Sequence, residues 1–216
     1  MFSSERLPLV EHYAARLADD GVVRGLIGPR EAPRLWARHL LNCGLLAEHL
    51  DPEVSVADIG SGAGLPGLVV AIARPDLSVT LVEPLLRRTT FLEEVVEDLG
   101  LTNVAVVRGR AEELAGDGEF DVVTSRAVAP LGKLVRWCLP LTAPHGVVLA
   151  MKGASAAEEV ERDAAAVRKA GGDRPTVIEL ARDGIDDPTW LVRVARRPQG
   201  SVGSRGARSR AQKKRR

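Results

Sequence analysis

Four glycines fall within eight residues, directly after a short apolar run, and this cluster is the part of the sequence most suggestive of chemistry. The run is residues 54–59, and the glycines are Gly60, Gly62, Gly64 and Gly67. The run is typical of a buried parallel strand, whereas no strand or helix interior accepts glycine at such density. Residues 68–73 then predict a helix. A strand, a glycine loop and a helix in this order hold nucleotide-like cofactors, because glycine lets a ligand approach bare backbone. The structural alternative is a glycine-rich turn without a ligand.

The residues around the loop narrow the class of cofactor. Asp58 precedes Gly60 by two residues, and Leu65 occupies the position of the third glycine in a dinucleotide fingerprint. An acid at this place is typical of S-adenosylmethionine (SAM) methyltransferases, where the loop faces a sulfonium and an amino acid. A carboxylate suits the ammonium of that cofactor or its ordered waters, and it would repel a pyrophosphate.

A second acid has the spacing of a ribose-binding residue. Glu83 ends the apolar run 78–83, about twenty residues beyond the loop, where Rossmann-like folds place such an acid. Its two oxygens can accept hydrogen bonds from both ribose hydroxyls. An acid at a strand end is by itself more often just solvated, but its spacing from the glycine loop favours the cofactor role.

Composition indicates one α/β domain of ordinary size. The chain has 216 residues, of which 45% are hydrophobic and only 3% aromatic, so aliphatic side chains must fill the core. Cys43 and Cys138 lie far apart and predict buried thiols, with no disulfide framework and no metal site. There is no apolar run near the length of a membrane span and no signal peptide. We therefore expect a soluble cytoplasmic protein without membrane contact.

Charge is distributed unevenly along the chain. Residues 196–216 carry nine basic side chains and no acid, and removing them from the net charge of +1 leaves residues 1–195 at −8. A tail rich in Gly, Ser, Arg and Lys has little to bury, so we expect it to be disordered alone. Nucleic acid is its natural partner, because counterion release drives such binding. A tail that serves only solubility is the alternative.

The N-terminal residues predict two helices, at 5–20 and 31–50, that form an extension over residues 1–50. Arg34, Arg38 and His39 make a basic patch on the second helix. This patch faces RNA phosphates in one interpretation and is the solvated side of an amphipathic helix in the other. The sequence leaves both open.

The rest of the chain alternates strands and helices. Further strands are expected at 78–83, 103–108, 120–125, 147–153, 175–180 and 190–195, with helices at 85–99, 131–139 and 155–170. Gly100 is expected to terminate a helix, and residues 144–146 to form a turn. A short polar turn, 183–188, predicts a final hairpin, so the last strand should be antiparallel. The expected fold is a seven-stranded, Rossmann-like SAM methyltransferase sheet over residues 51–197, followed by the tail 198–216.

Several residues follow the ends of the predicted strands, where ligands bind in open α/β sheets. Ala111 and Glu112 come after the third strand and are candidates to contact an adenine. Arg126 ends the fourth strand and is a candidate for the cofactor, for RNA phosphate or for a structural ion pair. Lys152 is delivered to the same edge by the fifth strand.

An ordered set of motifs resembles one family. The motifs are RHLLNCG, DIGSGAGLPG, LVEPLLRRTTFL, RAEEL, TSRAVAPL and LAMKG, spread over residues 31–195. The chain resembles the RsmG (GidB) family of bacterial small-subunit rRNA guanine-N7 methyltransferases. This resemblance implies SAM contacts from the glycine loop, including Gly60, Gly62 and Leu65, and from Ala111, Glu112 and Arg126, with Glu83 near the ribose. The family often has Asp in place of Glu83 and Gly-x-Gly-Pro-Gly in place of Gly-Ser-Gly-Ala-Gly. The basic tail is not a general family feature.

The implied chemistry requires orientation rather than a general base. Guanine N7 already presents a lone pair, so no catalytic residue of that kind and no metal is expected, and the enzyme must align N7 with the methyl group. The N7 edge of a guanine is poorly accessible in an RNA helix. The target guanine of 16S rRNA should therefore lie in a loop or be modified in an assembling small-subunit particle. Arg126, together with Lys152, Arg38, Arg210, Lys213 and Lys214, is expected to contact the RNA. No obligate protein partner is implied.

Two other functions are alternatives. An NAD-dependent oxidoreductase would need a glycine at position 65 and a catalytic residue facing the nicotinamide. An RNA-binding protein with a relict nucleotide fold would depend on the basic tail, but the presence of Asp58, Glu83 and Arg126 argues against decay of the cofactor site.

Overall fold

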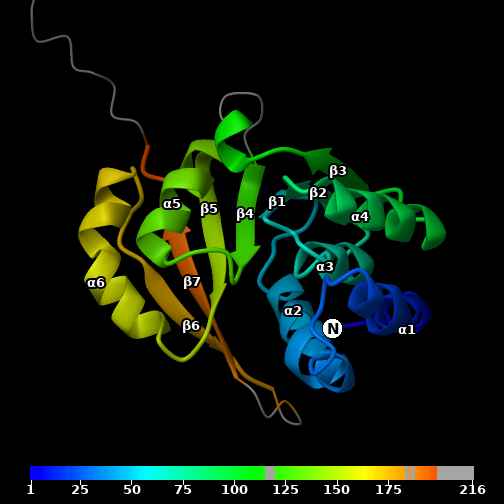
Figure 1. The fold of residues 1–216 in the computed structure, drawn as a ribbon. Helices are drawn as coiled ribbons and strands as arrows, with labels where there is room; N and C mark the ends of the chain where they lie inside the picture. The colour runs from blue at the N-terminus through cyan, green and yellow to red at the C-terminus, as the bar shows by residue number, and fades with distance from the viewer. Residues whose placement is uncertain (115–119, 183–184, 186–187, 199–216) are drawn as a thin grey trace, which may run out of the picture.

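The computed structural model describes residues 1–114, 120–182, 185 and 188–198, and its centre is a seven-stranded sheet (Figure 1). The strands are β1 (Ser55–Ile59), β2 (Ser78–Glu83), β3 (Val104–Arg108), β4 (Phe120–Arg126), β5 (Thr142–Lys152), β6 (Thr176–Leu180) and β7 (Thr189–Ala195). Their order is β3-β2-β1-β4-β5-β7-β6. Strands β1 to β5 pair in parallel, and β7 runs antiparallel to both of its neighbours. The predicted fold class, the antiparallel pairing of the last two strands and the reversed last strand are therefore confirmed. The predicted turn at 183–188 lies largely outside the described residues.

Helices cover both faces of the sheet (Figure 1). One face packs against α1 (Leu7–Arg16), α2 (Leu41–Ala47), α3 (Gly67–Ala73) and α4 (Leu86–Asp98). The other packs against α5 (Leu131–Cys138) and α6 (Ala156–Lys169). Strand β1 shows why the sheet must be covered twice: Val56 faces the first layer and Ala57 the second, and both are fully buried.

The N-terminal extension is helical, as predicted, but its helices are irregular. α1 continues into a π-helical turn at Leu17–Gly21, and a 3₁₀ turn at Ala32–Arg34 and a π-helical segment at Leu35–Leu40 precede α2. Its buried side chains, among them Tyr13 and Leu46, belong to the same core as the sheet residues Val56 and Leu81. The division into an extension and a methyltransferase domain stays a prediction.

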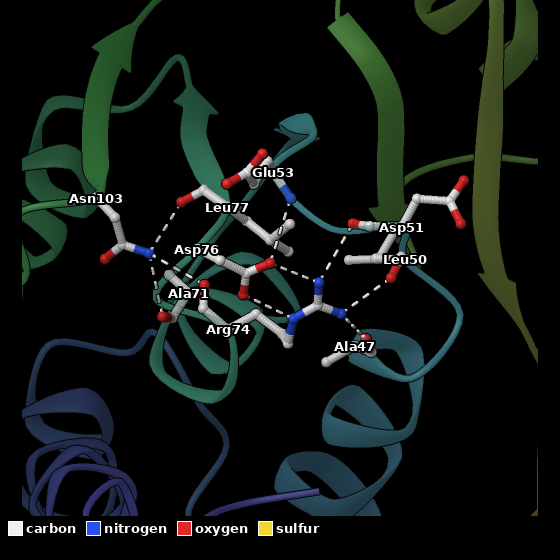
Figure 2. Close-up of polar contacts among 9 residues, drawn as sticks. All are labelled: Ala47, Leu50, Asp51, Glu53, Ala71, Arg74, Asp76, Leu77 and Asn103. Carbon is white, nitrogen blue, oxygen red and sulfur yellow. Dashed lines mark hydrogen bonds and ion pairs between the residues drawn. The ribbon is translucent and has the colours of Figure 1, made fainter.

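Arg74 joins this extension to the sheet (Figure 2). Its guanidinium donates to the carbonyls of Ala47 and Leu50 at 3.0 and 2.9 Å, where α2 ends, and to the carbonyl of Asp51 at 3.2 Å. Asp76 holds the guanidinium from the other side, at 2.8 and 2.7 Å. The free carbonyls of a helix end are thus paired by a side chain from the α3–β2 turn.

Asn103 braces the same turn. Its Nδ2 donates to the carbonyls of Ala71, Arg74 and Leu77 at 3.1–3.3 Å (Figure 2). The end of α3 is therefore held by the residue that immediately precedes β3.

Two local expectations had different outcomes. Gly100 ends α4 with φ 61°, as expected of a helix-terminating glycine. The expectation of a turn at 144–146 was wrong, because β5 begins at Thr142 and passes through these residues. The register between β4 and β5 shifts there, which accommodates His145 at φ 72° as a local irregularity of the strand. No helix in the described part of the chain is long and apolar enough to span a membrane.

Candidate cofactor and substrate site

The glycine loop has the backbone that the sequence predicts. Gly60, Gly62 and Gly64 have φ values of 71°, 60° and 103°, which side chains rarely adopt. A Cβ at Gly60 would lie 2.7 Å from the Val128 side chain, so glycine is also needed for space. Tyr13 of α1 donates its hydroxyl hydrogen to the Ala63 carbonyl at 2.7 Å. The N-terminal extension therefore fixes the loop directly.

Asp58 lies deeper than the sequence suggests. Its side chain is fully buried, and Oδ2 accepts a hydrogen bond of 3.0 Å from the Gly67 amide at the start of α3. Oδ1 has no hydrogen-bond partner among the described residues. Burial raises the pKa of Asp58 to about 7, against the opposing effect of the Gly67 hydrogen bond. Asp58 thus supports the start of α3 and is not among the residues that line the cavity described below, and its role toward a ligand ammonium or ordered waters stays a prediction.

Glu83 lies at the end of β2 and organises the loop. Its Oε2 accepts the Gly62 amide hydrogen at 3.0 Å, and Oε1 accepts that of Leu85 at 3.1 Å. Arg88 approaches Oε2 at 3.3 Å. The carboxylate is almost fully buried, yet it lines a cavity, so it combines a structural contact with a surface offered to a ligand.

This glycine-loop cavity has a volume of about 640 Å³ and lies over the carboxyl ends of β1 to β4. Five of the predicted cofactor residues line it: Gly60, Glu83, Ala111, Glu112 and Arg126. Gly62 lies behind the lining and donates to Glu83, and Leu65 packs against the core. The volume is within the range of sites for small-molecule cofactors.

A second cavity, of about 860 Å³, adjoins the first at the ends of β4 and β5. The two share Arg126, Ala127 and Val128 in their linings. We call the second the β4–β5 cavity. Arg34, Arg38 and Lys152 give it positive charge, and Trp190 gives it an aromatic wall.

The basic residues predicted to contact RNA differ in their accessibility. Arg38 is 45% exposed and lies 3.2 Å from Glu31. The Lys152 side chain is only 9% exposed, and its ammonium donates to the Ala129 carbonyl at 2.7 Å and to Glu159 at 2.9 Å. Lys152 is thus paired within the fold, and its contact with RNA stays a prediction. Arg210, Lys213 and Lys214 lie outside the described residues.

Arg126 stands at the junction of the two cavities. One of its guanidinium nitrogens is 3.3 Å from the Cys43 sulfur, and the other contacts Nδ1 of His39. Within the described residues no carboxylate pairs with it, so the predicted structural ion pair is absent there. The thiols of Cys43 and Cys138 are both buried, as predicted.

Sequence reasoning misplaced or missed other residues here. His39 is only 8% exposed and contacts Arg126 and Glu31, so it is not an exposed member of the basic patch in either of the two interpretations. Val128, Trp137 and Trp190 line the cavities without having been singled out. No local pattern marks these three residues as lining a cavity, although Trp137 has a cation–π contact with Lys133, whose ammonium lies 4.9 Å from the ring centroid.

Comparison with known proteins agrees with this geometry. The family described as rRNA small subunit methyltransferase G matches residues 6–183. The chain belongs to this family. It is 59% identical over 202 residues to the ribosomal RNA small subunit methyltransferase G of a Nocardioides species, covering 94% of this chain and 81% of that protein. It is 56% identical over 220 residues to the protein of that name from Salinispora tropica, covering 95% and 91%. The family membership confirms the resemblance seen in the sequence motifs.

Solved structures with low identity support the fold. An S-adenosyl-L-methionine-dependent methyltransferase from Methanococcus maripaludis, described as putative, has a TM-score of 0.61 at 14% identity, covering 80% of this chain and 94% of that one. The M. jannaschii protein TYW2, solved in complex with AdoMet, has a TM-score of 0.57 at 16% identity, covering 74% and 77%. These similarities place the chain among methyltransferase folds, and the family makes it an enzyme of small-subunit rRNA methylation.

Proposed function

We propose that this protein transfers the methyl group of SAM to N7 of one guanine in 16S rRNA, in the cytoplasm. The observation that carries the proposal is the glycine-loop cavity, which is bounded by Gly60 and Glu83 and opens at Arg126 into a second, basic cavity. The family supplies the methyl-transfer activity and the rRNA substrate, and the arrangement of the cavities supplies the place for each reactant.

The residues of the glycine-loop cavity fit SAM. Gly60 leaves the backbone bare where a Cβ would collide with Val128, and the almost fully buried Glu83 carboxylate can accept a ribose hydroxyl hydrogen bond. Ala111 and Glu112 also line this cavity and would contact the adenine. Arg126 is a cation without a carboxylate partner in the described chain, which suits the carboxylate of the amino-acid moiety.

The chemistry required of the protein is orientation. SAM supplies an electrophilic methyl group when bound. The chain must hold guanine N7 in line with that methyl group at near-attack distance, and no proton has to be removed from N7. The shared wall of Arg126, Ala127 and Val128 is the place where the two reactants would meet.

The β4–β5 cavity suits the RNA. Arg34 and Arg38 provide charge for phosphates, and Trp190 provides a ring on which a base can stack. A guanine turned out of a loop would enter this cavity and point its N7 edge toward the shared wall.

Mass spectrometry of 16S rRNA from cells lacking the protein tests this function. We expect the loss of one 7-methylguanine, which the wild-type gene restores. Full modification of the rRNA in the deletion strain would contradict the proposal. Purified protein should also methylate small-subunit particles from the deletion strain, with label transferred from SAM.

A further inference from the structure

We propose that Glu31 and His39 are positioning residues for methyl transfer: they fix the Arg126 guanidinium at the wall between the two cavities. This inference rests on the proposed function. It makes the N-terminal extension part of the active site, because Glu31 and His39 precede α2 whereas Arg126 ends β4.

The three side chains form a chain of contacts with one possible proton arrangement. Nε2 of His39 lies 2.8 Å from Oε2 of Glu31, and Nδ1 of His39 contacts the Arg126 guanidinium. A guanidinium only donates, so Nδ1 must accept and carries no proton. Nε2 then bears the hydrogen and donates it to the carboxylate, which only accepts. The carboxylate orients the imidazole, and the imidazole orients the arginine.

Both residues that contact the Arg126 guanidinium, His39 and Cys43, are buried. His39 is 8% exposed, whereas Glu31 is 32% exposed in its side chain and lies toward solvent. The second contact of Arg126, the Cys43 sulfur at 3.3 Å, comes from a fully buried thiol, and burial raises the pKa of that thiol. The thiol is therefore neutral and a weak acceptor, which leaves His39 as the stronger of the two contacts.

The charged groups that face His39 make its protonation unfavourable. They are Arg126 at Nδ1, Glu31 at Nε2 and Arg38 one residue earlier in the chain. Burial and the Arg126 charge hold the pKa of His39 below its usual range, while Glu31 raises it. At neutral pH the imidazole is thus neutral and accepts from Arg126. Protonation on acidification removes this acceptor and places a second cation beside the guanidinium.

The test measures the affinity for S-adenosylhomocysteine by calorimetry, and the methylation rate of undermethylated small-subunit particles, between pH 5.5 and 8. We expect both to fall on the acid side in the unaltered protein. His39→Gln should weaken binding about 10-fold at pH 7.5, as expected when one hydrogen bond to a charged group is removed, and should abolish the acid limb. Glu31→Gln keeps an acceptor for Nε2–H but removes the charge that raises the pKa, so the acid limb should move to lower pH.

The matched control is His12→Gln. His12 also pairs with a carboxylate, Asp98 at 3.1 Å, but it is 48% exposed on α1. This variant should keep wild-type affinity and pH dependence. The inference is overturned if His39→Gln, shown to be folded by its melting curve, binds like the control. If His39→Gln does not fold, an unmoved acid limb in Glu31→Gln overturns it. An unaltered chain that binds no cofactor at all would instead overturn the proposed function, and this inference with it.

Discussion

Two buried carboxylates, Asp58 and Glu83, stabilise different parts of the glycine loop. Asp58 holds the start of α3 through the Gly67 amide, and Glu83 holds the Gly62 amide at the edge of the cavity. Asp58 is away from the cavity lining and Glu83 is part of it. Because only Glu83 lines the cavity, we expect neutralising Asp58 to affect mainly stability and neutralising Glu83 to affect mainly cofactor binding.

Replacing Asp58 with Asn should make stability less dependent on pH. An unfolded aspartate ionises near 3.8, but the folded one has a pKa of about 7. Between these values the folded chain binds more protons, so the contribution of Asp58 to stability falls as pH rises and is least above pH 7. The melting temperature of Asp58→Asn minus that of the wild type should thus increase from pH 5 to pH 8, by several degrees. Differential scanning fluorimetry measures this difference.

Asp51→Asn is the control for this experiment, because Asp51 is exposed and its side chain can stay hydrated. Its melting temperature should stay close to that of the wild type at every pH, as is usual for a substitution at an exposed position. A constant difference for Asp58→Asn as well would refute the role assigned to burial.

Replacing Glu83 with Gln should weaken cofactor binding with a smaller effect on folding. Gln keeps the volume and one acceptor oxygen, but its NH₂ group faces the donors that Glu83 accepts from. We expect the dissociation constant for SAM to rise about 10-fold or more, measured by calorimetry. Glu97→Gln, on the exposed side of α4, should bind as the wild type does. Equal affinities in the two variants would argue against Glu83 as a cofactor residue.

At the scale of elements, Arg74 shows how the extension is attached to the sheet. The end of α2 and the α3–β2 turn meet at one guanidinium, which pairs three carbonyls and the Asp76 carboxylate (Figure 2). Tyr13 of α1 donates a hydrogen bond to the glycine loop, so the N-terminal extension contacts the cofactor site. A substitution of Arg74 that loosens the attachment of the extension should therefore also affect that site.

Arg74→Ala should therefore destabilise the protein by about 2–3 kcal/mol, because it removes hydrogen bonds from a charged group and leaves the carbonyls of Ala47 and Leu50 without this partner. Arg74→Lys should recover only part of this, because an ammonium cannot reproduce the fork of the guanidinium. Urea unfolding measures both. Arg182→Ala is the matched control, since Arg182 is 45% exposed and pairs with Glu48 at the surface. It should cost less than about 1 kcal/mol. A similar loss of stability in Arg74→Ala and Arg182→Ala would contradict the role assigned to Arg74 in attaching the extension to the sheet.

At the level of the whole molecule, positive charge is concentrated at the C-terminal end of the sequence. Residues 196–216 carry nine basic side chains without an acid, and the rest of the chain is negative. A net negative surface repels RNA, so productive binding needs local positive charge, which the β4–β5 cavity and the tail supply.

Removing residues 198–216 should lower affinity for 16S rRNA and flatten its dependence on salt. Every phosphate that the protein no longer neutralises reduces the slope of log affinity against log salt by roughly one. Affinity for SAM should be unchanged, because the glycine-loop cavity is built from residues 59–137. Filter binding at several salt concentrations measures the slope. An unchanged slope would mean that the tail does not bind RNA.

Much of the sheet could be predicted locally. Strand β2 and the end of α3 fall at the predicted residues, and Gly100 ends α4 as expected, because apolar periodicity and glycine act within a few residues. The prediction of a turn at 144–146 was wrong, because β5 already begins at Thr142 and continues through these residues. The register skips from Thr142, opposite Phe120, to Val147, opposite Val122, so Pro-His-Gly forms an irregularity inside a strand that is paired on both sides of it. The local sequence does not contain these partners on β4.

Motif order and spacing were enough to predict the class of fold, the cofactor loop and the family, because strand–loop–helix order can be read along the chain. The partner of each polar side chain, in contrast, is set by packing. Asp58 accepts from the Gly67 amide, Lys152 is held by Glu159, and His39 contacts Arg126. Burial and pairing depend on residues distant in sequence: His39 and Arg126 are 87 positions apart, and no local pattern encodes their contact.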